Sequence, residues 1–249
     1  MATYNGSAYV AEQIESIVAQ LGPDDELVVV DDCSTDDTAS VVVATAERLG
    51  ESRILLTKTD SNVGYVRAFE AAIRRARGKY VFLSDQDDVW TAGRHEAMIT
   101  GLSRSLVVAA NHSILGRNGA RLWYPPLRAA QSRRRFANLF ALLVGYRPYF
   151  GCAMGFRREA IDGGLLPIPA YVSESHDVWI AITGNVRGSI RHLDEVVVER
   201  RLHGSNQTPL GIRGLPAILR ARVMFLRLIA EATRRATAAR RARRAASLR

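Results

Sequence analysis

Acidic residues gather directly after two apolar runs of this sequence, and they are the first candidates for chemistry. Residues 28–30 (VVV) lead into Asp31 and Asp32, and residues 79–83 lead into 84–88 (SDQDD), where three carboxylates stand within four positions. Carboxylates this close repel one another unless a cation lies among them. Mg²⁺ or Mn²⁺ suits such a group, and a hard cation also binds the oxygens of a diphosphate. The second cluster therefore predicts a metal site, although acidic loops without a metal are also frequent.

Asp31 and Asp32 are expected at the carboxyl end of a strand, where open α/β sheets bind their ligands. One carboxylate there can accept a hydrogen bond from a nucleobase N–H while the other holds the loop. The residues that follow, 34–37 (STDD), are also typical helix N-caps. For that stretch, capping of the next helix is an equally good interpretation.

Two later segments carry polar side chains whose local meaning is weaker. Residues 174–177 (ESHD) open an expected helix, and acids at that place commonly do no more than pair with the helix dipole. Residues 200–206 (RRLHGSN) combine cations, a histidine and a glycine in one loop, which could hold a phosphate. Taken alone, a solvated basic loop explains the second segment as well.

The elements that position these residues alternate along the first 110 residues. Short apolar runs predict strands over 26–31, 53–57, 79–84 and 105–110. Apolar residues at helical spacing predict helices over 7–20, 36–49 and 62–77. This alternation is typical of an α/β fold with a doubly wound, mainly parallel sheet.

The second half of the sequence is less regular. We expect a helix over 133–144, a strand over 150–156, a helix over 174–184, and a strand pair or one bent strand over 189–199. Residues 117–119 (RNG) predict a turn between two antiparallel strands. At the N-terminus only Met1 and Ala2 precede an apparent loop, so the first strand is expected to be truncated. Either the true start lies upstream, which we favour, or the chain lacks its first strand, which would loosen Thr3 and Tyr4.

The formal charge of +9 on 249 residues is concentrated at one end of the chain. Residues 213–249 hold eleven arginines and one acid, whereas residues 1–212 hold 23 basic and 24 acidic residues. Apolar residues recur at helical spacing from Leu215 onward, which predicts a basic amphipathic helix. We therefore divide the chain into a catalytic part, 1–212, with halves 1–110 and 111–212, and an Arg-rich tail, 213–249.

Several classes of protein are disfavoured by composition. Two cysteines, Cys33 and Cys152, make no disulfide framework or zinc cluster, which favours a reducing, cytoplasmic setting. No apolar run is long enough to cross a bilayer, and the N-terminus has no secretory pattern. A nearly neutral folded part without a stacking platform argues against the alternative of a nucleic-acid-binding module, so no nucleic acid is expected as a partner.

Six motifs, in this order, resemble those of family-two glycosyltransferases with a GT-A fold. The resemblance covers about residues 1–208 and is closest to a bacterial, rhamnosyltransferase-like subgroup. The motifs are ATYNG (2–6), VVDDCSTDDT (29–38), NVGYVRAFEAAI (62–73), YVFLSDQDDVW (80–90), SHDVWIA (175–181) and RLHGSNQT (201–208). Three positions depart from the family pattern, with Cys33 in place of glycine, Gly93 in place of an acid and Arg200 in place of an aromatic residue. Cys33 is expected to crowd its turn.

The resemblance implies a role for each matched residue. Thr3, Tyr4 and Asp32 would hold the nucleobase and ribose, and Arg67 would lie near the nucleotide or diphosphate. The remaining matched residues fall into three roles. They are Asp85 and Arg201 at the diphosphate, Asp87 and His203 as ligands of Mg²⁺ or Mn²⁺, and Asp177 as the catalytic base. Residues 149–155 and 123–126 would wall the acceptor cleft, although both segments could equally be core.

The implied reaction is transfer of a sugar from a nucleoside diphosphate to a hydroxyl group, with inversion at the anomeric carbon. The donor would be dTDP-rhamnose or a UDP-sugar, and the acceptor a glycan or lipid-linked glycan of the cell surface. The rival enzyme class is a sugar-phosphate nucleotidyltransferase, which usually carries an early glycine-rich, basic loop that residues 3–6 do not supply. The tail would either lie on the anionic inner face of the plasma membrane or simply be solvated.

Overall fold

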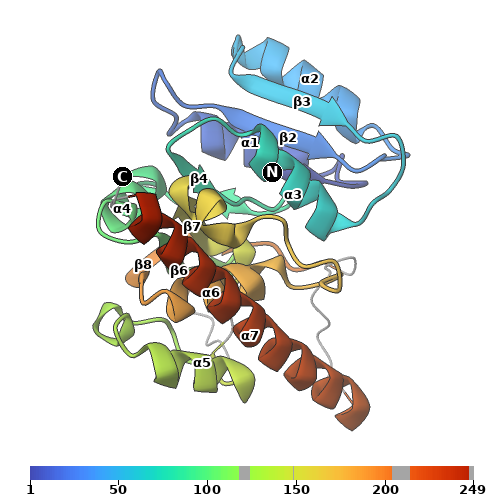
Figure 1. Cartoon of the computed structure of the whole chain (residues 1–249). Helices are drawn as coiled ribbons and strands as arrows, with labels where there is room; N and C mark the ends of the chain where they lie inside the picture. The colour runs from blue at the N-terminus through green and yellow to red at the C-terminus, as the bar shows by residue number, and fades with distance from the viewer. Residues whose placement is uncertain (118–123, 148, 204–213, 247–249) are drawn as a thin grey trace.

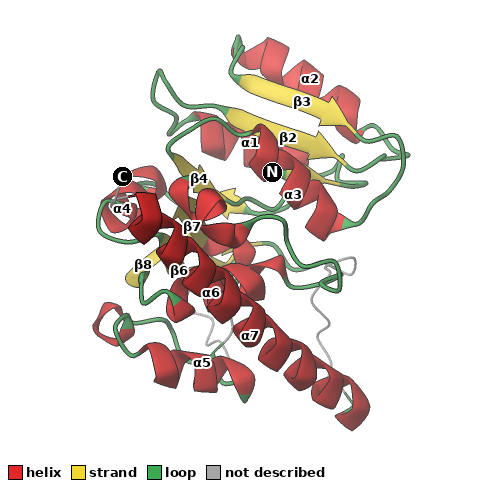
Figure 2. Cartoon of the chain, in the orientation of Figure 1, coloured by secondary structure: helices red, strands yellow, loops and turns green. Residues whose placement is uncertain are grey.

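The computed structural model describes residues 1–117, 124–147, 149–203 and 214–246, and it is an α/β protein (Figures 1 and 2). Its N-terminal part is a parallel sheet in the order β1 (Ala2–Thr3), β2 (Leu27–Asp31), β3 (Ile54–Lys58). The helices α1 (Val10–Val18), α2 (Thr38–Leu49) and α3 (Tyr65–Arg75) follow the strands in turn. This is the alternation that the apolar periods predict, and β2 is buried along its whole length.

The first strand, expected to be truncated, is present as two residues, whereas the loosening expected for Thr3 is not observed. Ala2 and Thr3 pair in parallel with Val30 and Asp31, and the Asp32 N–H donates to the Thr3 carbonyl at 2.8 Å. Thr3 is buried, and its hydroxyl donates to Asp31 Oδ1 at 3.0 Å. Two residues are enough because β2 supplies the neighbouring ladder, and Thr3 is held firmly rather than loosely.

The second sheet is mixed, in the order β4 (Tyr80–Phe82), β7 (Met154–Arg157), β6 (Val107–Ile114), β8 (Ile190–Arg200), β5 (Val89–Trp90). β6 and β8 pair in parallel, whereas β7 lies antiparallel between β4 and β6. The bent-strand alternative is the one observed for residues 189–199, because β8 is one strand whose register against β6 shifts near Asn111. The expected turn at 117–119 lies largely outside the described residues.

Helices cover this second sheet and complete the core. They are α4 (Arg94–Leu102), α5 (Arg135–Leu143), α6 (His176–Val186) and α7 (Leu215–Ala246), with 3₁₀ turns at Ala129–Gln131 and Gly151–Ala153 and a π-helical turn at Ile161–Leu165. The first half of the strand expected over 150–156 is therefore a 3₁₀ turn. Trp179 and Ile180 of α6 are fully buried and pack in the same cluster as Phe156 of β7.

The predicted Arg-rich helix exists as α7, and it packs on the rest of the molecule. Leu228, Ala232 and Ala236 are buried, and α7 contacts α5, α6 and the Ile161–Leu165 turn. Figure 1 shows α7 running across α6, with α5 and the first turns of α7 at the end of the molecule away from α2 and β3. Part of the apolar face of α7 is thus already used in packing. No described helix is both long enough and apolar enough to cross a membrane.

Candidate active site

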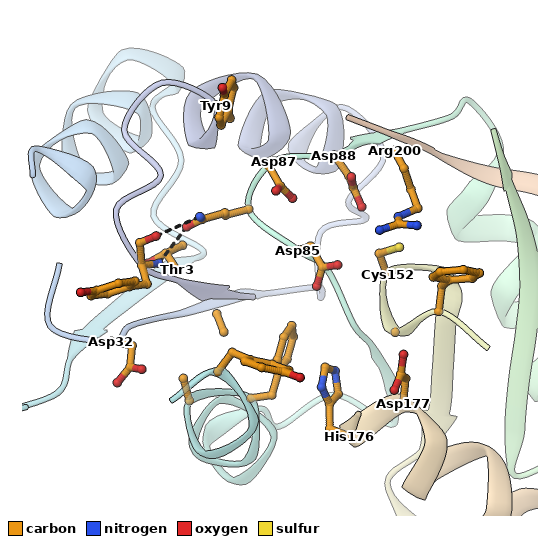
Figure 3. Close-up of a pocket in the computed structure, with 18 of the residues that line it drawn as sticks. Thr3, Tyr9, Asp32, Asp85, Asp87, Asp88, Cys152, His176, Asp177 and Arg200 are labelled. Atoms are coloured by element: carbon orange, nitrogen blue, oxygen red, sulfur yellow. Dashed lines mark hydrogen bonds between the residues drawn. The ribbon is translucent and has the colours of Figure 1, made fainter. Parts of the chain in front are cut away.

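One cavity of about 420 Å³ receives most of the side chains that the sequence singles out (Figure 3). It lies where the ends of β1, β2 and β4 meet the start of α6. The predicted residues that line it are Thr3, Tyr4, Asp32, Asp85, Asp87, Asp177 and His203. Residues separated by up to 200 positions therefore share one concave surface, as the resemblance implies.

The paired acids at the end of β2 have different surroundings. Asp31 is fully buried and accepts hydrogen bonds from the Thr3 hydroxyl and from the Ser34 N–H, the latter at 3.0 Å. Asp32 accepts from the N–H groups of Val63 and Gly64, each at 2.8 Å, and lines the cavity. Asp31 therefore braces the strand end, while Asp32 joins the cavity wall to the loop before α3.

Cys33 follows these acids with a backbone φ of 60°. This is the left-handed region, which glycine occupies at little cost and which strains a residue with a Cβ. The family pattern has glycine at this position, and the expected crowding is observed here as backbone strain rather than as loss of the turn.

Gln86 links the first loop to the acidic loop, although no local sequence pattern singles it out. Its Oε1 accepts from the Tyr4 N–H at 2.8 Å, and its Nε2 donates to the Tyr4 carbonyl at 3.0 Å. A Cβ on Gly6 would lie 2.3 Å from the Gln86 amide, so a larger residue at that position would displace the end of the Gln86 side chain from Tyr4. The backbone of Tyr4 is thus fixed against the acidic loop.

The acidic loop itself is electrostatically unfavourable. Burial, followed by the charges of Asp88 and Asp87, raises the pKa of Asp85 well above its ordinary value. Burial and Asp87 likewise raise the pKa of Asp88. Asp88 Oδ1 accepts from the Arg201 N–H at 3.1 Å, whereas its buried Oδ2 has no hydrogen-bond partner among the described residues.

Asp87 and His203 come together as predicted, since His203 Nε2 lies 2.8 Å from Asp87 Oδ2. The His203 ring stacks on Tyr9 with centroids 4.8 Å apart. Arg201 lies behind the loop rather than among the lining residues. Its Nε donates to the Asp87 carbonyl at 3.1 Å and its guanidinium pairs with Glu12, so it shapes the loop from outside the cavity.

Arg67 also lies apart from the cavity lining, contrary to the expectation of a place beside the diphosphate. Its guanidinium pairs with Glu70 and donates to the carbonyls of Ile168 and Pro169 at 3.0 and 2.9 Å. It makes this contact because α3 packs beside the segment that precedes α6. Arg67 thus holds the segment at Ile168 and Pro169 in place, and this segment leads into α6 and Asp177.

Asp177 stands in the first turn of α6 and points into the cavity (Figure 3). The Val178 N–H donates to its Oδ1 at 2.7 Å, and burial raises its pKa to about 6. The preceding Ser175 has a φ of 66°, and its N–H donates to the Tyr65 hydroxyl at 3.0 Å. The chain thus enters α6 through a fixed turn, which sets the direction of the carboxylate.

Two further cavity residues escaped the sequence analysis as site residues. His176 stacks on Phe69 with centroids 4.2 Å apart, and neither ring nitrogen has a hydrogen-bond partner among the described residues. Burial lowers the pKa of His176 to about 4, so the ring is neutral near pH 7. Arg200 lies with its guanidinium 4.6 Å from the Phe150 ring centroid and faces the acids. Its departure from the family pattern was the available signal.

The expected acceptor wall is partly observed. Phe150, Gly151 and Cys152 line the cavity, whereas Tyr149 and Ala153 are buried in the core. Trp123, in the other expected wall segment, lies outside the described residues.

The site has the donor atoms that a divalent cation needs. Asp85, Asp88 and Cys152 each place one ligand atom within 4.8 Å of the others, beside the Asp87–His203 pair. The unpartnered Asp88 oxygen and the raised pKa values both indicate that these carboxylates lack sufficient positive charge around them. Carboxylate oxygens are the ligands that Mg²⁺ and Mn²⁺ prefer, so the residues fit such an ion.

Parts of this chain are similar in sequence to bacterial polysaccharide-biosynthesis proteins and glycosyltransferases. The succinoglycan biosynthesis protein ExoO of Rhizobium meliloti is 38% identical over 99 residues, which are 40% of this chain and 27% of ExoO. An Escherichia coli protein, the UDP-Glc:alpha-D-GlcNAc-diphosphoundecaprenol beta-1,3-glucosyltransferase WfaP, is 31% identical over 90 residues, 36% of this chain and 34% of WfaP. The matched regions thus span about a third or less of each relative.

Solved structures with the same arrangement include Staphylococcus aureus TarS 1-349 in complex with UDP-GlcNAc. It has a TM-score of 0.66 and 17% identity, over 94% of this chain and 70% of that one. The mannosyltransferase PcManGT from Pyrobaculum calidifontis, in complex with GDP-Man and Mn²⁺, has a TM-score of 0.59 and 22% identity. The match covers 98% of this chain and 74% of PcManGT. These likenesses confirm the GT-A fold. The model of glycosyl transferase family 2 matches residues 1–165, and the chain belongs to that family.

Proposed function

We propose that this protein transfers a sugar from a nucleoside-diphosphate donor to an acceptor hydroxyl, with inversion at the anomeric carbon. One observation carries the proposal, namely that Asp177 and the acidic loop containing Asp85 and Asp87 line the same cavity. A carboxylate that can act as a base and the group that would receive the diphosphate thereby face one cavity. Transfer in a single displacement needs both groups, because the attacking hydroxyl and the leaving group lie on opposite faces of the sugar.

The residues of the chain divide the work along the cavity. Thr3, Tyr4 and Asp32 hold the nucleoside at one end, where the Tyr4 backbone is fixed by Gln86. Asp177 at the other end accepts the proton of the acceptor hydroxyl, an assistance typically worth about 10²- to 10⁴-fold in rate. A pKa near 6 leaves Asp177 ionised at neutral pH while keeping it basic enough to take the proton.

We propose that Asp87 and His203 hold Mg²⁺ or Mn²⁺, with Asp85 beside the diphosphate. When bound, such an ion offsets the charge that grows on the departing diphosphate. The Mn²⁺ of the PcManGT complex supports this part of the proposal by analogy of fold. Arg201 keeps the loop in shape from behind through the Asp87 carbonyl.

For the donor we propose dTDP-rhamnose or a UDP-sugar, and for the acceptor a lipid-linked glycan of cell-surface polysaccharide. ExoO supports the polysaccharide assignment and WfaP supports a lipid-linked acceptor. Such an acceptor lies in the inner leaflet of the membrane, so we propose that the protein works at that surface.

A thermal-shift screen tests the donor. The full chain with Mn²⁺ is titrated with dTDP-rhamnose, UDP-glucose, UDP-GlcNAc and GDP-mannose, each beside its own nucleoside diphosphate. We expect one nucleotide series to stabilise the protein and its sugar nucleotide to release nucleoside diphosphate when an acceptor glycan is added. Release of pyrophosphate from a nucleoside triphosphate and sugar phosphate would instead identify a nucleotidyltransferase and overturn the proposal.

A further inference from the structure

Two helices at one end of the molecule carry large apolar side chains that the described residues leave exposed. On α5, Phe136 and Phe140 are 72% and 65% exposed, and they lie one turn apart on the same face. On the first half of α7, Leu219, Val223 and Leu226 are 66%, 52% and 54% exposed at helical spacing. Large side chains exposed in such numbers mark a surface that meets something apolar.

The two helices belong to one region. They contact each other, and a Cβ on Gly145, just after α5, would lie 2.7 Å from an Arg222 guanidinium nitrogen of α7. Figure 1 shows α5 and the first turns of α7 at the end of the molecule opposite α2 and β3. We call the exposed apolar residues of α5 and of α7 up to Leu226, with the arginines among them, the α5–α7 surface.

The charge on this surface has one sign. Residues 133–144 contain three arginines and no acid, and residues 214–227 contain three arginines and no acid. Two neighbouring arginines do not add to this charge, because Arg147 is buried and Arg128 lies 3.7 Å from Asp194. Arg133, Arg134 and Arg135 are exposed at the start of α5, and the Arg135 guanidinium lies 4.6 Å from the Phe136 ring centroid. Apolar side chains among cations, with no acid nearby in the sequence, match the interface of an anionic bilayer.

The distal part of the tail has a different character. From Leu228 onward the apolar face of α7 is buried on the core at Leu228, Ala232 and Ala236. Its outward side there carries arginines such as Arg240 and Arg241, with no exposed large apolar residue among those described up to residue 246. Among the described residues of α7, charge alone therefore remains on the distal part, whereas its first half carries apolar groups together with charge.

We infer that the α5–α7 surface is the part of this protein that lies on an anionic phospholipid membrane. Phe136, Phe140 and Leu219 would enter the headgroup region, and the arginines would meet lipid phosphates. The inference rests on the proposed function only for the reason that membrane binding would be useful, namely that it would bring the enzyme to a lipid-linked acceptor. α6 packs against both helices and carries Asp177 at its start, so docking by this surface would hold the catalytic carboxylate near the bilayer.

Flotation of the full chain with lipid vesicles tests this inference. Phosphatidylcholine vesicles are compared with vesicles that also contain phosphatidylglycerol, at low and high salt. We expect binding to the anionic vesicles that weakens with salt. Replacing Arg133, Arg134 and Arg135 with Gln should weaken it on the order of a hundredfold, since each surface arginine contributes about fivefold.

Two serine pairs separate the apolar contribution from general damage. The variant F136S/F140S should bind the anionic vesicles at least about tenfold more weakly, because two large apolar side chains no longer leave water. Its matched control is V43S/L55S, which removes two half-exposed apolar residues from α2 and β3 at the opposite end. The control should bind like the unmodified protein.

A second control addresses the distal tail. The triple variant R240Q/R241Q/R244Q removes as much charge as the α5 variant and should float almost unchanged. Equal losses in both triple variants would overturn the inference and assign binding to net charge alone. Absence of binding to anionic vesicles would also overturn the inference. Self-association in solution that depends on Phe136 and Phe140 would overturn it too, and would identify a second copy of the chain as the partner of this surface.

Donor binding by each variant, followed by thermal shift, keeps this test independent of the proposed function. If the protein floats as expected but no sugar nucleotide stabilises it, the membrane-binding surface is supported and the glycosyl-transfer proposal is refuted. If it binds a donor and transfers sugar to a soluble acceptor but does not float, the glycosyl-transfer proposal is supported and the membrane-binding surface is refuted.

Discussion

Replacing Asp177 with Asn should abolish most transfer while making the folded protein more stable. The amide oxygen can still accept the Val178 N–H, which donates to Asp177 Oδ1 at 2.7 Å, so the start of α6 should keep its shape. The amide cannot take a proton from the acceptor hydroxyl. Loss of a general base typically lowers the rate about 10²- to 10⁴-fold, and we expect a loss in this range with donor binding unchanged.

The gain in stability follows from the raised pKa. Burial moves the pKa of Asp177 from 3.8 to about 6, so the folded state holds this proton more tightly than the unfolded state does. The stabilising effect of that proton is complete below pH 3.8 and is lost as the pH rises through 6. At 1.36 kcal/mol per pKa unit, ionisation at pH 7 costs at most about 3 kcal/mol. Partial contact with solvent reduces this to about 2 kcal/mol.

Two measurements on the same preparation of Asp177→Asn check the loss of transfer and the gain in stability. Release of nucleoside diphosphate gives kcat and KM, and thermal unfolding at pH 7 and pH 5 gives the stability difference. We expect a melting temperature about 5 °C higher at pH 7 and a smaller gain at pH 5. The exposed carboxylate of Glu159 offers a control in Glu159→Gln, which should change neither quantity. Transfer within tenfold of the unmodified enzyme, or a variant less stable at pH 7, would refute the reasoning.

Four other changes address the remaining parts of the site. EDTA should stop transfer and Mn²⁺ should restore it, with a higher melting temperature in Mn²⁺; full turnover in EDTA would show the acidic loop to be structural. Arg200→Gln should lower the Mn²⁺ concentration for half-maximal activity severalfold, because a cation that faces the acids is removed; an unchanged Mn²⁺ titration would contradict this. Asp31→Ala should lower the free energy of unfolding in urea by about 3 kcal/mol, since buried donors of Thr3 and Ser34 lose a charged acceptor. Cys33→Gly should raise it by about 1 kcal/mol by relieving the left-handed backbone, and a loss of stability would refute that account.

Local sequence patterns were sufficient for the residues that follow buried strands. The apolar runs at 26–31 and 79–84 predicted β2 and β4, and the carboxylates behind them do line one cavity. Such predictions succeed because a strand end and the loop after it are fixed by neighbouring residues. For β1 the same reasoning indicated only a truncated strand, because two residues leave no visible pattern and the pairing with β2 defines them.

Contacts between distant segments were not predictable in this way. β7 lies antiparallel between β4 and β6, and no period within residues 154–157 encodes its neighbours. Arg67 illustrates the same limit, because its motif placed it near the ligand while packing placed its guanidinium on the carbonyls of Ile168 and Pro169. A motif match gives the position of a residue in the chain, and only packing gives the direction of its side chain.

His176 and Arg200, the two cavity residues that the sequence analysis did not single out as site residues, affect the charge of the cavity differently. Asp85, Asp87 and Asp88 lie close together, and burial together with the neighbouring carboxylates raises the pKa of Asp85 and of Asp88, while His203 lies 2.8 Å from Asp87. His176 adds no positive charge, because burial lowers its pKa to about 4. Arg200 is therefore the cation within the described lining that faces these acids. Its place in the family pattern commonly holds an aromatic residue, so this chain supplies part of the compensating charge itself, and the divalent cation that we propose would have correspondingly less charge to neutralise.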